Sequence, residues 1–598
     1  MKIKNILILA ALVGSFSACA DLFEPALENI QTEEQMFRDP SSAQGILGYA
    51  YANLPFETKS TTDIATDDAV TNDLGNNLRA MAQGTWTANN NPVSQWDARK
   101  STIQYLNLFI KNAADVPWSD TDYKQAMFVD KLLGEAYALR ALNMYYLLRN
   151  HAGWTSGGEL LGVPIILEPE GAGSDFNQPR ATFKACVDQI YADIDAAMEL
   201  IPMDYEDIAG PSDIPAKYKQ IGVTNHVDYN MVFGSTFRGR MSGRIAEAIK
   251  AQVALLAASP AYSEGSGVTY EEAANATAAV LNRIGGLSGV DPKGYRWFAE
   301  ASVIDGLASG QNPAEILWRG SINQGTEDYA FGINQEKDNF PPTLYGSGRI
   351  NPTQNLVDAF PMANGYPITD PQSGYSKNNP YADRDPRLNE YVLYNGATYK
   401  DVQIITGAYS SDDNGLNKTA NSTRTGYYLR KLLREDCNPN PSATNAKKHY
   451  PVYMRYTEFY LAYAEAANEA WGPDGKGSHG YSAYDVIKAL RARAGVGSAN
   501  GDAYLESVKS DQAKMRELIR NERRIEMCFE NKRFWDMRRW KVDLNSTAMG
   551  VSVKQAGGSL SYEYIEVEPR NYRDHMYYGP IPETEVLKWS NLDQNMGW

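Results

Sequence analysis

The chain has 598 residues, more than the roughly 150 of an ordinary domain, and its 22% charged and 43% hydrophobic residues are typical of a soluble globular protein. Its 73 acidic and 57 basic residues give a formal charge of -16, which argues against a nucleic-acid-binding protein because contacts to phosphates need a basic face. The 38 Tyr and 11 Trp residues have rings with an apolar face and a hydrogen-bonding edge, so the composition favours a binding protein over an enzyme.

Residues 1–18 predict a lipoprotein signal peptide. Two lysines precede the apolar run Ile6–Val13, which is shorter than the roughly 20 residues that span a bilayer, and small residues precede Cys19. Small residues directly before a cysteine resemble the bacterial lipobox, so we expect Cys19 to be lipidated; an ordinary signal peptide is the alternative. Residues 19–40 are then the lipidated N-terminus and an acidic tether.

Residues 41–598 predict one mainly α domain. Ala-rich stretches with helical periodicity are each followed by a second amphipathic stretch, and these pairs fall near 42–114, 131–200, 244–284 and 453–494. In the last pair Ala462, Ala466 and Ala470 recur every four residues, which lets a neighbouring backbone approach closely. Such pairs resemble degenerate tetratricopeptide repeats without a 34-residue period, so we expect them to form a scaffold.

Between about 291 and 451 the character of the chain changes. Gly, Pro, Asn and Tyr dominate, helical periodicity is lost, and short β-like runs occur. A segment of this length without regular structure is uncommon in a compact domain unless it is functional. We expect a long, irregular, loop-rich region with short β-hairpins that covers one face of the scaffold and binds the ligand.

The sequence predicts neither a metal site nor a cofactor. The cysteines after Cys19 are Cys186, Cys437 and Cys528; they form no C-x-x-C pair, and the five histidines lack zinc-type spacing. Cys186 and Cys528 lie among helix-patterned apolar residues and are expected to be small core side chains. No phosphate-binding loop, dinucleotide fingerprint or nucleophile elbow is found in the sequence.

The segment Arg520–Trp540 reads RNERRIEMCFENKRFWDMRRW. Glu522 and Glu526 lie within one helical turn of three arginines, which predicts a lattice of charges within the helix. Carboxylates held among arginines have lowered pKa values, which suits a structural role and not acid catalysis. The apolar residues around them fall on one face, which we expect to pack on the helix pairs.

This segment belongs to a set of motifs that closely resembles the SusD/RagB family of surface glycan-binding lipoproteins. The other members of the set are the C-terminal YYGPIPETEVLKWSNLDQNMGW, RYTE from Arg455, AEA from Ala464, PTQNLVDAFPMANGYP from Pro352 and YADRDPRL from Tyr381. With the N-terminal lipid signal, the resemblance covers nearly the whole chain. Its C-terminal signature comprises residues 518–598.

The resemblance implies a non-enzymatic lipoprotein in the outer membrane, facing the cell exterior. Such a protein is a lid over a TonB-dependent transporter of the SusC type, to which it delivers captured oligo- or polysaccharide. One branch of the family binds peptides instead. The resemblance implies no cofactor, and a glycan-binding site on loops outside the helix pairs.

Sugars stack their C–H faces on Trp and Tyr, and their hydroxyls need polar partners. Trp86 lies in a polar, Asn-rich loop where the pattern does not predict burial, and Trp318 ends a β-like run. Asp67 and Asp68 lie in the segment 63–73, which matches an acidic segment common in the family. The candidate ligand-binding residues are Asp67, Asp68, Trp86, Trp318, Tyr329 and Arg349.

Three alternatives remain open from the sequence. Each aromatic candidate could be a core residue, and Asp67 could cap a helix or fix a loop. A surface glycosidase would need two carboxylates about 5–10 Å apart across a cleft. Tetratricopeptide-like grooves also bind peptide segments, so a protein-interaction scaffold is a further possibility.

Overall fold

The computed structural model describes residues 33–57, 62–322 and 333–598. The predicted signal peptide, the predicted lipidation site Cys19 and the candidate Tyr329 lie outside the described residues. The described end of the predicted tether is part of the fold, because Glu33–Arg38 form helix α2 and Phe37 is buried in the main core. No helix in the described part of the chain is both long enough and apolar enough to cross a membrane.

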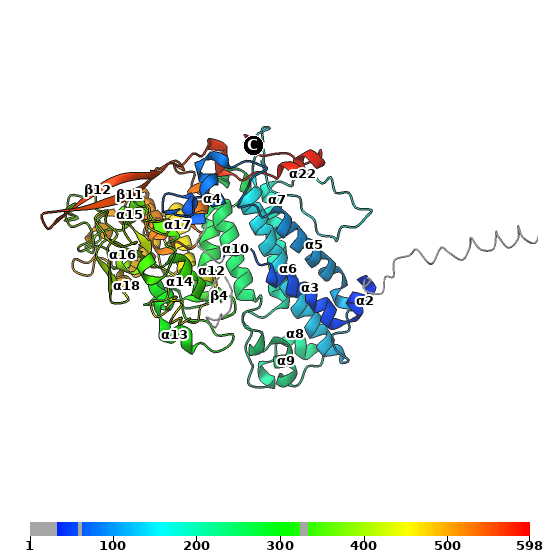
Figure 1. Cartoon of the computed structure of the whole chain (residues 1–598). Helices are drawn as coiled ribbons and strands as arrows, with labels where there is room; N and C mark the ends of the chain where they lie inside the picture. The colour runs from blue at the N-terminus through cyan, green and yellow to red at the C-terminus, as the bar shows by residue number, and fades with distance from the viewer. Residues whose placement is uncertain (1–32, 58–61, 323–332) are drawn as a thin grey trace, which may run out of the picture.

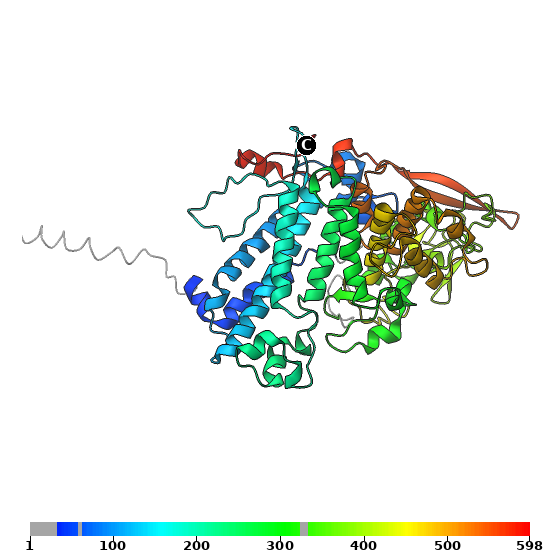
Figure 2. The same ribbon diagram turned by 180° about the vertical axis from the view of Figure 1, so that it is seen from behind.

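Long helices that pack side by side form the scaffold (Figures 1 and 2), which confirms the predicted mainly α fold. Both helices of each predicted pair are present. The scaffold helices are α3 (Pro40–Ala52), α5 (Trp96–Asn112), α6 (Asp122–His151), α7 (Phe183–Leu200), α10 (Gly243–Ala258), α12 (Tyr270–Asn282), α17 (Tyr456–Trp471), α18 (Ala483–Arg493) and α20 (Gln512–Met527).

Local sequence signals begin these helices, and small residues bring them together. The Thr182 hydroxyl accepts from the N–H of Ala185 at the start of α7, and Thr269 and Glu272 form a capping box at the start of α12. Ala462 and Ala466 are buried in the core where α17 packs against α12 and α20. The four-residue alanine spacing therefore serves the close helix contacts that it predicts.

Shorter helices connect the scaffold to the rest of the chain. They include α4 (Asn77–Ala80), α8 (Ala216–Gln220), α9 (His226–Phe233), α11 (Ser263–Ser266), α13 (Ala301–Gly306), α14 (Ile333–Asn339), α15 (Gln354–Ala359), α16 (Pro386–Tyr391), α19 (Ala503–Val508), α21 (Arg533–Arg539) and α22 (Glu583–Lys588). Figure 1 shows α8 and α9 at one end of the long helices and α22 at the other.

The strands of the described residues form antiparallel pairs and no larger sheet. The pairs are β1 (Ala69–Thr71) with β5 (Ile350–Pro352), β2 (Gly153–Trp154) with β3 (Leu160–Leu161), β4 (Ile316–Arg319) with β10 (Val452–Arg455), β6 (Val392–Leu393) with β9 (Tyr428–Leu429), β7 (Ala397–Tyr399) with β8 (Val402–Ile404), and β11 (Ala548–Ala556) with β12 (Ser559–Glu568). The hairpin β11–β12 extends along the edge of the molecule in Figure 1.

The irregular region has a hydrophobic core of its own, and helix α20 lies between this core and that of the scaffold. Leu518 and Ile519 pack into the scaffold core, whereas Ile525 and the following Phe529 pack into the core of the irregular region. The prediction that all four contact the helix pairs was therefore wrong for the last two. The signature segment joins the two parts of the domain.

The two signature carboxylates do not form the predicted lattice within their own helix. Glu522 binds Arg387 (2.9 Å) and Arg491 (2.8 Å), and Glu526 binds Arg387 (3.0 Å) and Arg493 (3.2 Å). The ionic partners of the two carboxylates are therefore arginines of α16 and α18, and not the arginines next to them in α20. All of these side chains are at most 3% exposed, and in such surroundings a carboxylate needs direct ionic partners.

The C-terminal segment closes on the end of α6. Nδ1 of His151 lies 2.7 Å from the carbonyl oxygen of Pro580, and Asn595 donates to the carbonyls of His151 and Gly579. A Cβ at Gly579 would lie 2.0 Å from the Asn150 carbonyl oxygen, so only glycine permits this approach. The GPIP motif thus packs against the C-terminal end of α6.

Candidate functional site

A groove lies between the scaffold and the irregular region, beside strand β4. Its volume is about 590 Å³, within the range of roughly 300–1,000 Å³ of small-molecule sites. Trp318 and Tyr453, from the paired strands β4 and β10, line one side, and Tyr51 lines another. A second depression of about 510 Å³ shares Trp318 with the groove and continues it toward Asp204 and Glu206.

Aromatic and polar side chains alternate around this groove. The ring of Tyr453 is half-buried, and Phe56 stacks on it with centroids 4.6 Å apart. Arg240 lines the groove and binds the buried Glu135 at 2.6 Å, and the hydroxyl of Tyr51 donates to the same carboxylate at 2.8 Å. Burial lowers the pKa of Arg240, but Glu135 outweighs that effect and raises it above its ordinary value. The guanidinium is therefore a fixed positive charge.

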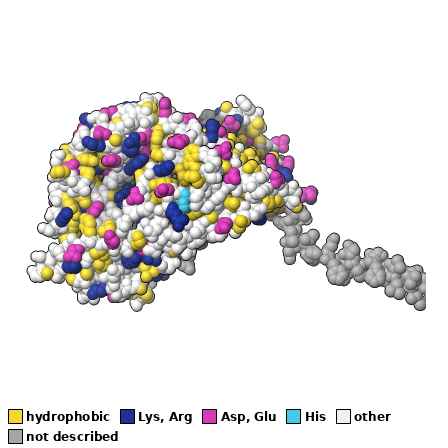
Figure 3. Space-filling view, turned by 90° about the horizontal axis from the view of Figure 1, so that it is seen from above, with side chains coloured by type: hydrophobic (Ala, Val, Ile, Leu, Met, Phe, Trp, Pro, Cys, Tyr) yellow, Lys and Arg dark blue, Asp and Glu magenta, His cyan; other side chains and the backbone are white. Residues whose placement is uncertain are grey.

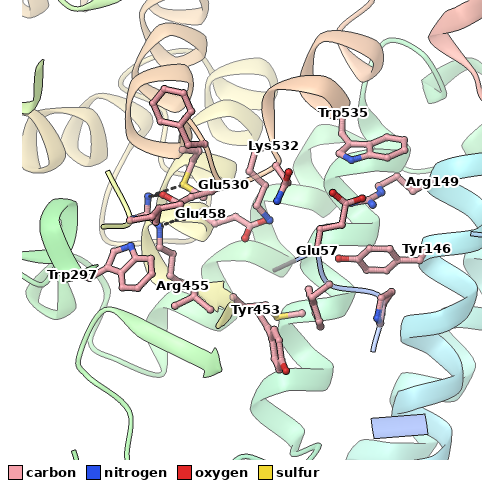
Figure 4. Close-up of a pocket in the computed structure, with 18 residues that line it drawn as sticks. Glu57, Tyr146, Arg149, Trp297, Tyr453, Arg455, Glu458, Glu530, Lys532 and Trp535 are labelled. Carbon is pink, nitrogen blue, oxygen red and sulfur yellow. Dashed lines mark hydrogen bonds and ion pairs between the residues drawn. The ribbon is translucent and has the colours of Figure 1, made fainter. Parts of the chain in front are cut away.

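A smaller cavity shares Tyr453 with the groove and is also lined by Phe56 (Figure 4). Its volume of about 80 Å³ is below the range of small-molecule sites. Arg149 of α6 lies between the rings of Tyr146 and Trp535, 4.2 and 4.1 Å from their centroids. Figure 4 shows these rings on the opposite side of the cavity from Trp297.

Two carboxylates that line the cavity, those of Glu458 and Glu530, form ion pairs. Glu458 accepts from Lys532 at 2.9 Å, and Glu530 binds Arg455 at 2.7 Å and Lys431 at 2.6 Å. Burial raises the pKa of Glu530, but Arg455 and Lys431 outweigh it and lower that pKa below its ordinary value. An ionised, paired carboxylate of this kind is a poor proton donor at neutral pH.

The acidic candidates lie far from solvent. Asp67 is 7% exposed and binds Arg524 (2.9 Å) and Arg533 (3.0 Å), while Asp68 is fully buried and accepts from Arg524 at 2.6 Å. Burial raises the pKa of Asp67, but the two guanidiniums outweigh it and hold that pKa below its ordinary range. The two carboxylates fix the chain that precedes β1 to the signature segment.

Trp86 is 3% exposed, although its polar loop does not predict burial. Its ring packs against Phe534, Tyr572 and Trp598, and its Nε1 donates to Asn91 at 3.0 Å. The apolar partners come from the C-terminal signature, which the local pattern around the loop does not contain. A ligand role for Trp86 stays a prediction, and the described contacts do not place it at the groove.

Trp318 and Arg349 occupy different parts of the molecule. The indole of Trp318 lines the groove but is only 1% exposed, and its Nε1 donates to the Gly239 carbonyl at 2.9 Å. Arg349 is half-buried beside β5, where it donates to the Asn72 side chain at 3.2 Å. The structure therefore brings Asp67, Asp68 and Arg349 to the β1–β5 pair and places Trp318 alone at the groove.

The sequence did not single out Tyr453, Arg240 and Tyr51, which line the groove. Tyr453 begins the stretch predicted as helix 453–471, but residues 452–455 form β10 and the helix begins at Tyr456. Arg240 lies in a loop without a motif. The pairing of β10 with β4, from distant parts of the chain, creates this wall, so no local signal identifies it.

The predicted core roles of two cysteines are confirmed. Cys186 and Cys528 are both at most 1% exposed. In the face seen in Figure 3, basic and acidic side chains are interspersed and hydrophobic side chains lie between them. That mixed surface agrees with the overall negative charge and lacks the continuous basic stripe of a nucleic-acid-binding face.

Two family models match the chain. The model described as the SusD family matches residues 314–598, and the model described as "Starch-binding associating with outer membrane" matches residues 38–217. One SusD-like protein of Formosa agariphila is 23% identical over 90% of this chain and 91% of its own length. Another from the same organism is 30% identical over 33% of this chain, a stretch that spans about a third of that relative (34%).

Solved structures share the fold. A SusD-like protein from Bacteroides fragilis has a TM-score of 0.69 at 22% identity, with 96% of this chain and 100% of that chain covered. A SusD-like carbohydrate-binding protein from the same species has a TM-score of 0.65 at 21% identity, with 93% and 99% covered. The two family models, one on the N-terminal and one on the C-terminal part of the chain, show that the chain belongs to the SusD family.

Proposed function

We propose that this protein captures oligo- or polysaccharide in the groove beside β4 and does not transform it. The groove itself carries the proposal: it has the volume of a small-molecule site, half-buried Tyr453 offers a ring, and Arg240 supplies a fixed donor. Pyranose rings stack on aromatic faces, and their hydroxyls need such polar partners. A carbohydrate-binding relative of the same fold supports this choice of ligand.

A binding role suits the charges better than catalysis does. A glycosidase needs one carboxyl group that holds a proton near neutral pH opposite a second, ionised one. Two of the cavity carboxylates, Glu458 and Glu530, are paired with cations, and the pKa of Glu530 is lowered. Release of reducing sugar from a bound glycan would contradict this part of the proposal.

The same proposal includes a location in the cell and a partner protein. A lipid on Cys19 would hold the protein in the outer membrane, facing outward, as a lid on a TonB-dependent transporter of the SusC type. The sequence before Cys19 and the family model that mentions the outer membrane support it. Mass spectrometry of the N-terminal peptide from bacterial membranes, with Cys19→Ala beside it, tests the anchor, and cross-linked membranes test the transporter.

Calorimetric titration of the chain from Ala20 onward, against panels of polysaccharides and peptides, tests capture. We compare Tyr453→Ala with Tyr453→Phe, because phenylalanine keeps the ring and removes only the hydroxyl. Loss of a stacked ring should weaken saccharide binding about tenfold, which corresponds to about 1.4 kcal/mol, whereas the Phe variant should keep most of it.

Tyr105→Ala is the control, since this exposed tyrosine lies on α5 and does not line the groove. Saccharide binding that survives in folded Tyr453→Ala would place the ligand elsewhere. Binding of peptides alone would move the protein to the peptide-binding branch of the family.

A further inference from the structure

Three side chains with metal-binding atoms meet inside the irregular region. Glu336 comes from α14, Cys437 from the loop after β9, and His449 from the segment that leads to β10. One carboxylate oxygen, the thiol sulfur and one imidazole nitrogen lie within 4.8 Å of one another, and the residues are 0%, 0% and 6% exposed. The residues are far apart in sequence, so the spacing of Cys and His did not predict the cluster.

The imidazole of His449 is oriented as a metal ligand is. Its Nδ1 lies 2.8 Å from the carbonyl oxygen of Lys447, which can only accept, so Nδ1 carries the hydrogen. In a neutral ring Nε2 is then a bare lone pair, and it points at a carboxylate oxygen of Glu336 at 3.1 Å. Two lone pairs at this distance repel unless a cation or a proton lies between them. Metal-bound histidines generally donate the other ring N–H to such a carbonyl or carboxylate.

Glu336 offers a second and independent sign of a ligand. Its Oε1, the oxygen that faces His449, also accepts from the backbone N–H of Arg434 at 2.8 Å, whereas Oε2 has no hydrogen-bond partner among the described residues. Buried polar atoms without a partner are few in native proteins, and an ion is one of their explanations. The carboxylate is 0% exposed, so water outside the protein does not satisfy it.

Two basic side chains near Cys437 have acceptors of their own. Arg434, the basic residue nearest to Cys437 along the chain, is bound by Asp305 at 2.8 Å and Asp436 at 2.6 Å, and Nζ of Lys400 donates to the Cys437 carbonyl at 2.6 Å. Cys437 is wholly buried in the core of the irregular region and, in the described structure, forms no disulfide. A thiol, an imidazole and a carboxylate are a mixed donor set, which favours zinc over calcium or magnesium.

We propose that Glu336, Cys437 and His449 form a buried binding site for a zinc ion. Zinc bonds of about 2.0–2.3 Å to sulfur, nitrogen and oxygen place tetrahedral ligand atoms roughly 3.3–3.8 Å apart. The Nε2–Oε1 separation of 3.1 Å is close to this, and the other separations are at most 4.8 Å. On binding, the thiol releases its proton to solvent and sulfur coordinates as a thiolate.

The ion would tie helix α14 and two loops of the irregular region together. Lys448, the residue before His449, lines the groove, and its Nζ donates to the carbonyl of Asp305. Closing a long loop by a metal removes conformational freedom from the unfolded chain, so the ion would stabilise this wall of the groove. The inference does not depend on which ligand the groove captures.

The test uses the chain from Ala20 to Trp598, which contains every described residue. After dialysis against a chelator, the protein is titrated with Zn²⁺, and bound metal is counted by elemental analysis after gel filtration. Cobalt(II) is used as a second probe, because a cobalt–thiolate bond gives a charge-transfer absorption. We expect one equivalent of zinc, a cobalt–thiolate band, and a higher melting temperature with stoichiometric zinc.

Cys437→Ala should abolish the cobalt–thiolate band, and His449→Gln should weaken zinc binding at least about tenfold. Cys528→Ala is the matched control, since Cys528 is equally buried and lies outside the cluster. Less than one equivalent of zinc in the parent, or zinc binding unchanged in both variants, would overturn the proposal. If a variant does not fold, the parent still decides, because cobalt binding without a thiolate band refutes the site.

Discussion

Replacing Glu526 by glutamine tests whether the signature helix is structural. Glu526 is fully buried and accepts from Arg387 at 3.0 Å and Arg493 at 3.2 Å. Glutamine keeps the shape of the side chain and removes only its charge. Arg387 and Arg493 then remain charged and buried, and each has lost one ionised partner.

The magnitude follows from the pKa of Glu526. Burial raises this pKa, but Arg493, Arg387 and Arg455 outweigh that effect and lower it from 4.5 to about 2. The difference between these two pKa values corresponds to roughly 3 kcal/mol, since one pKa unit is worth about 1.36 kcal/mol. Breaking a buried ion pair costs about 3–5 kcal/mol, a similar amount. We therefore expect a loss of about 3 kcal/mol in the free energy of unfolding at pH 7.

The sign of the pH dependence is also set. The folded pKa is lower than the unfolded one, so the carboxylate contributes fully above pH 4.5 and the contribution is lost as pH falls toward 2. At pH 3 about 1.4 kcal/mol should remain, so parent and Glu526→Gln should differ less there than at pH 7. Urea unfolding followed by near-UV circular dichroism at both pH values measures this.

Glu517→Gln is the matched control, because Glu517 is an exposed residue of the same helix. A loss in Glu526→Gln no larger than in this control would refute the reasoning. So would a variant of unchanged stability that no longer binds saccharide, since the signature would then carry the function.

Three other predictions concern the fold. Gly579→Ala should lower the free energy of unfolding by about 1–3 kcal/mol in urea, because its Cβ would meet the Asn150 carbonyl at 2.0 Å; a smaller loss would mean that the C-terminal segment can move away. Burial lowers the pKa of His151 from 6.5 to about 4, so the unfolded chain binds more protons than the folded one between these pH values. The free energy of unfolding should therefore fall by about 2 kcal/mol from pH 7 to pH 5 in the parent but not in His151→Gln. Equal losses in the two proteins would contradict this prediction. Burial, and after it the charge of Asp68, raises the pKa of Asp63 from 3.8 to about 7, so ionisation of Asp63 lowers the stability of the fold as pH rises from about 4 to 7. Asp63→Asn should therefore unfold at a higher urea concentration than the parent at pH 8 but not at pH 4. A variant that is less stable than the parent at pH 8 would refute this prediction.

Helix positions were predictable from the sequence because helical periodicity is local. The pair predicted near 131–200 ends where α7 ends, at Leu200, and the pair predicted near 244–284 begins one residue after the start of α10. A residue's neighbours at three and four positions decide which face is apolar, whatever the rest of the chain does. The C-terminal signature was also visible in the sequence as a string of residues, and it indicated the family.

The predicted site depended on contacts between residues that are far apart in the sequence, which local patterns do not reveal. Trp86 has polar neighbours in the chain, yet rings of the C-terminal segment cover it, and Tyr453 faces the groove only because β10 pairs with β4. Exposure is a property of the whole packed surface, so a local polar pattern is a weak guide to it.

The sequence by itself determined the helical scaffold and the family, since periodicity and motif need no knowledge of distant contacts. Only the tertiary structure decided the partners of Glu526, the burial of the candidate Trp86, the groove and the meeting of Glu336, Cys437 and His449. The physical reason is that ion pairs and metal ligands act over a few ångströms in space, whatever their separation along the chain.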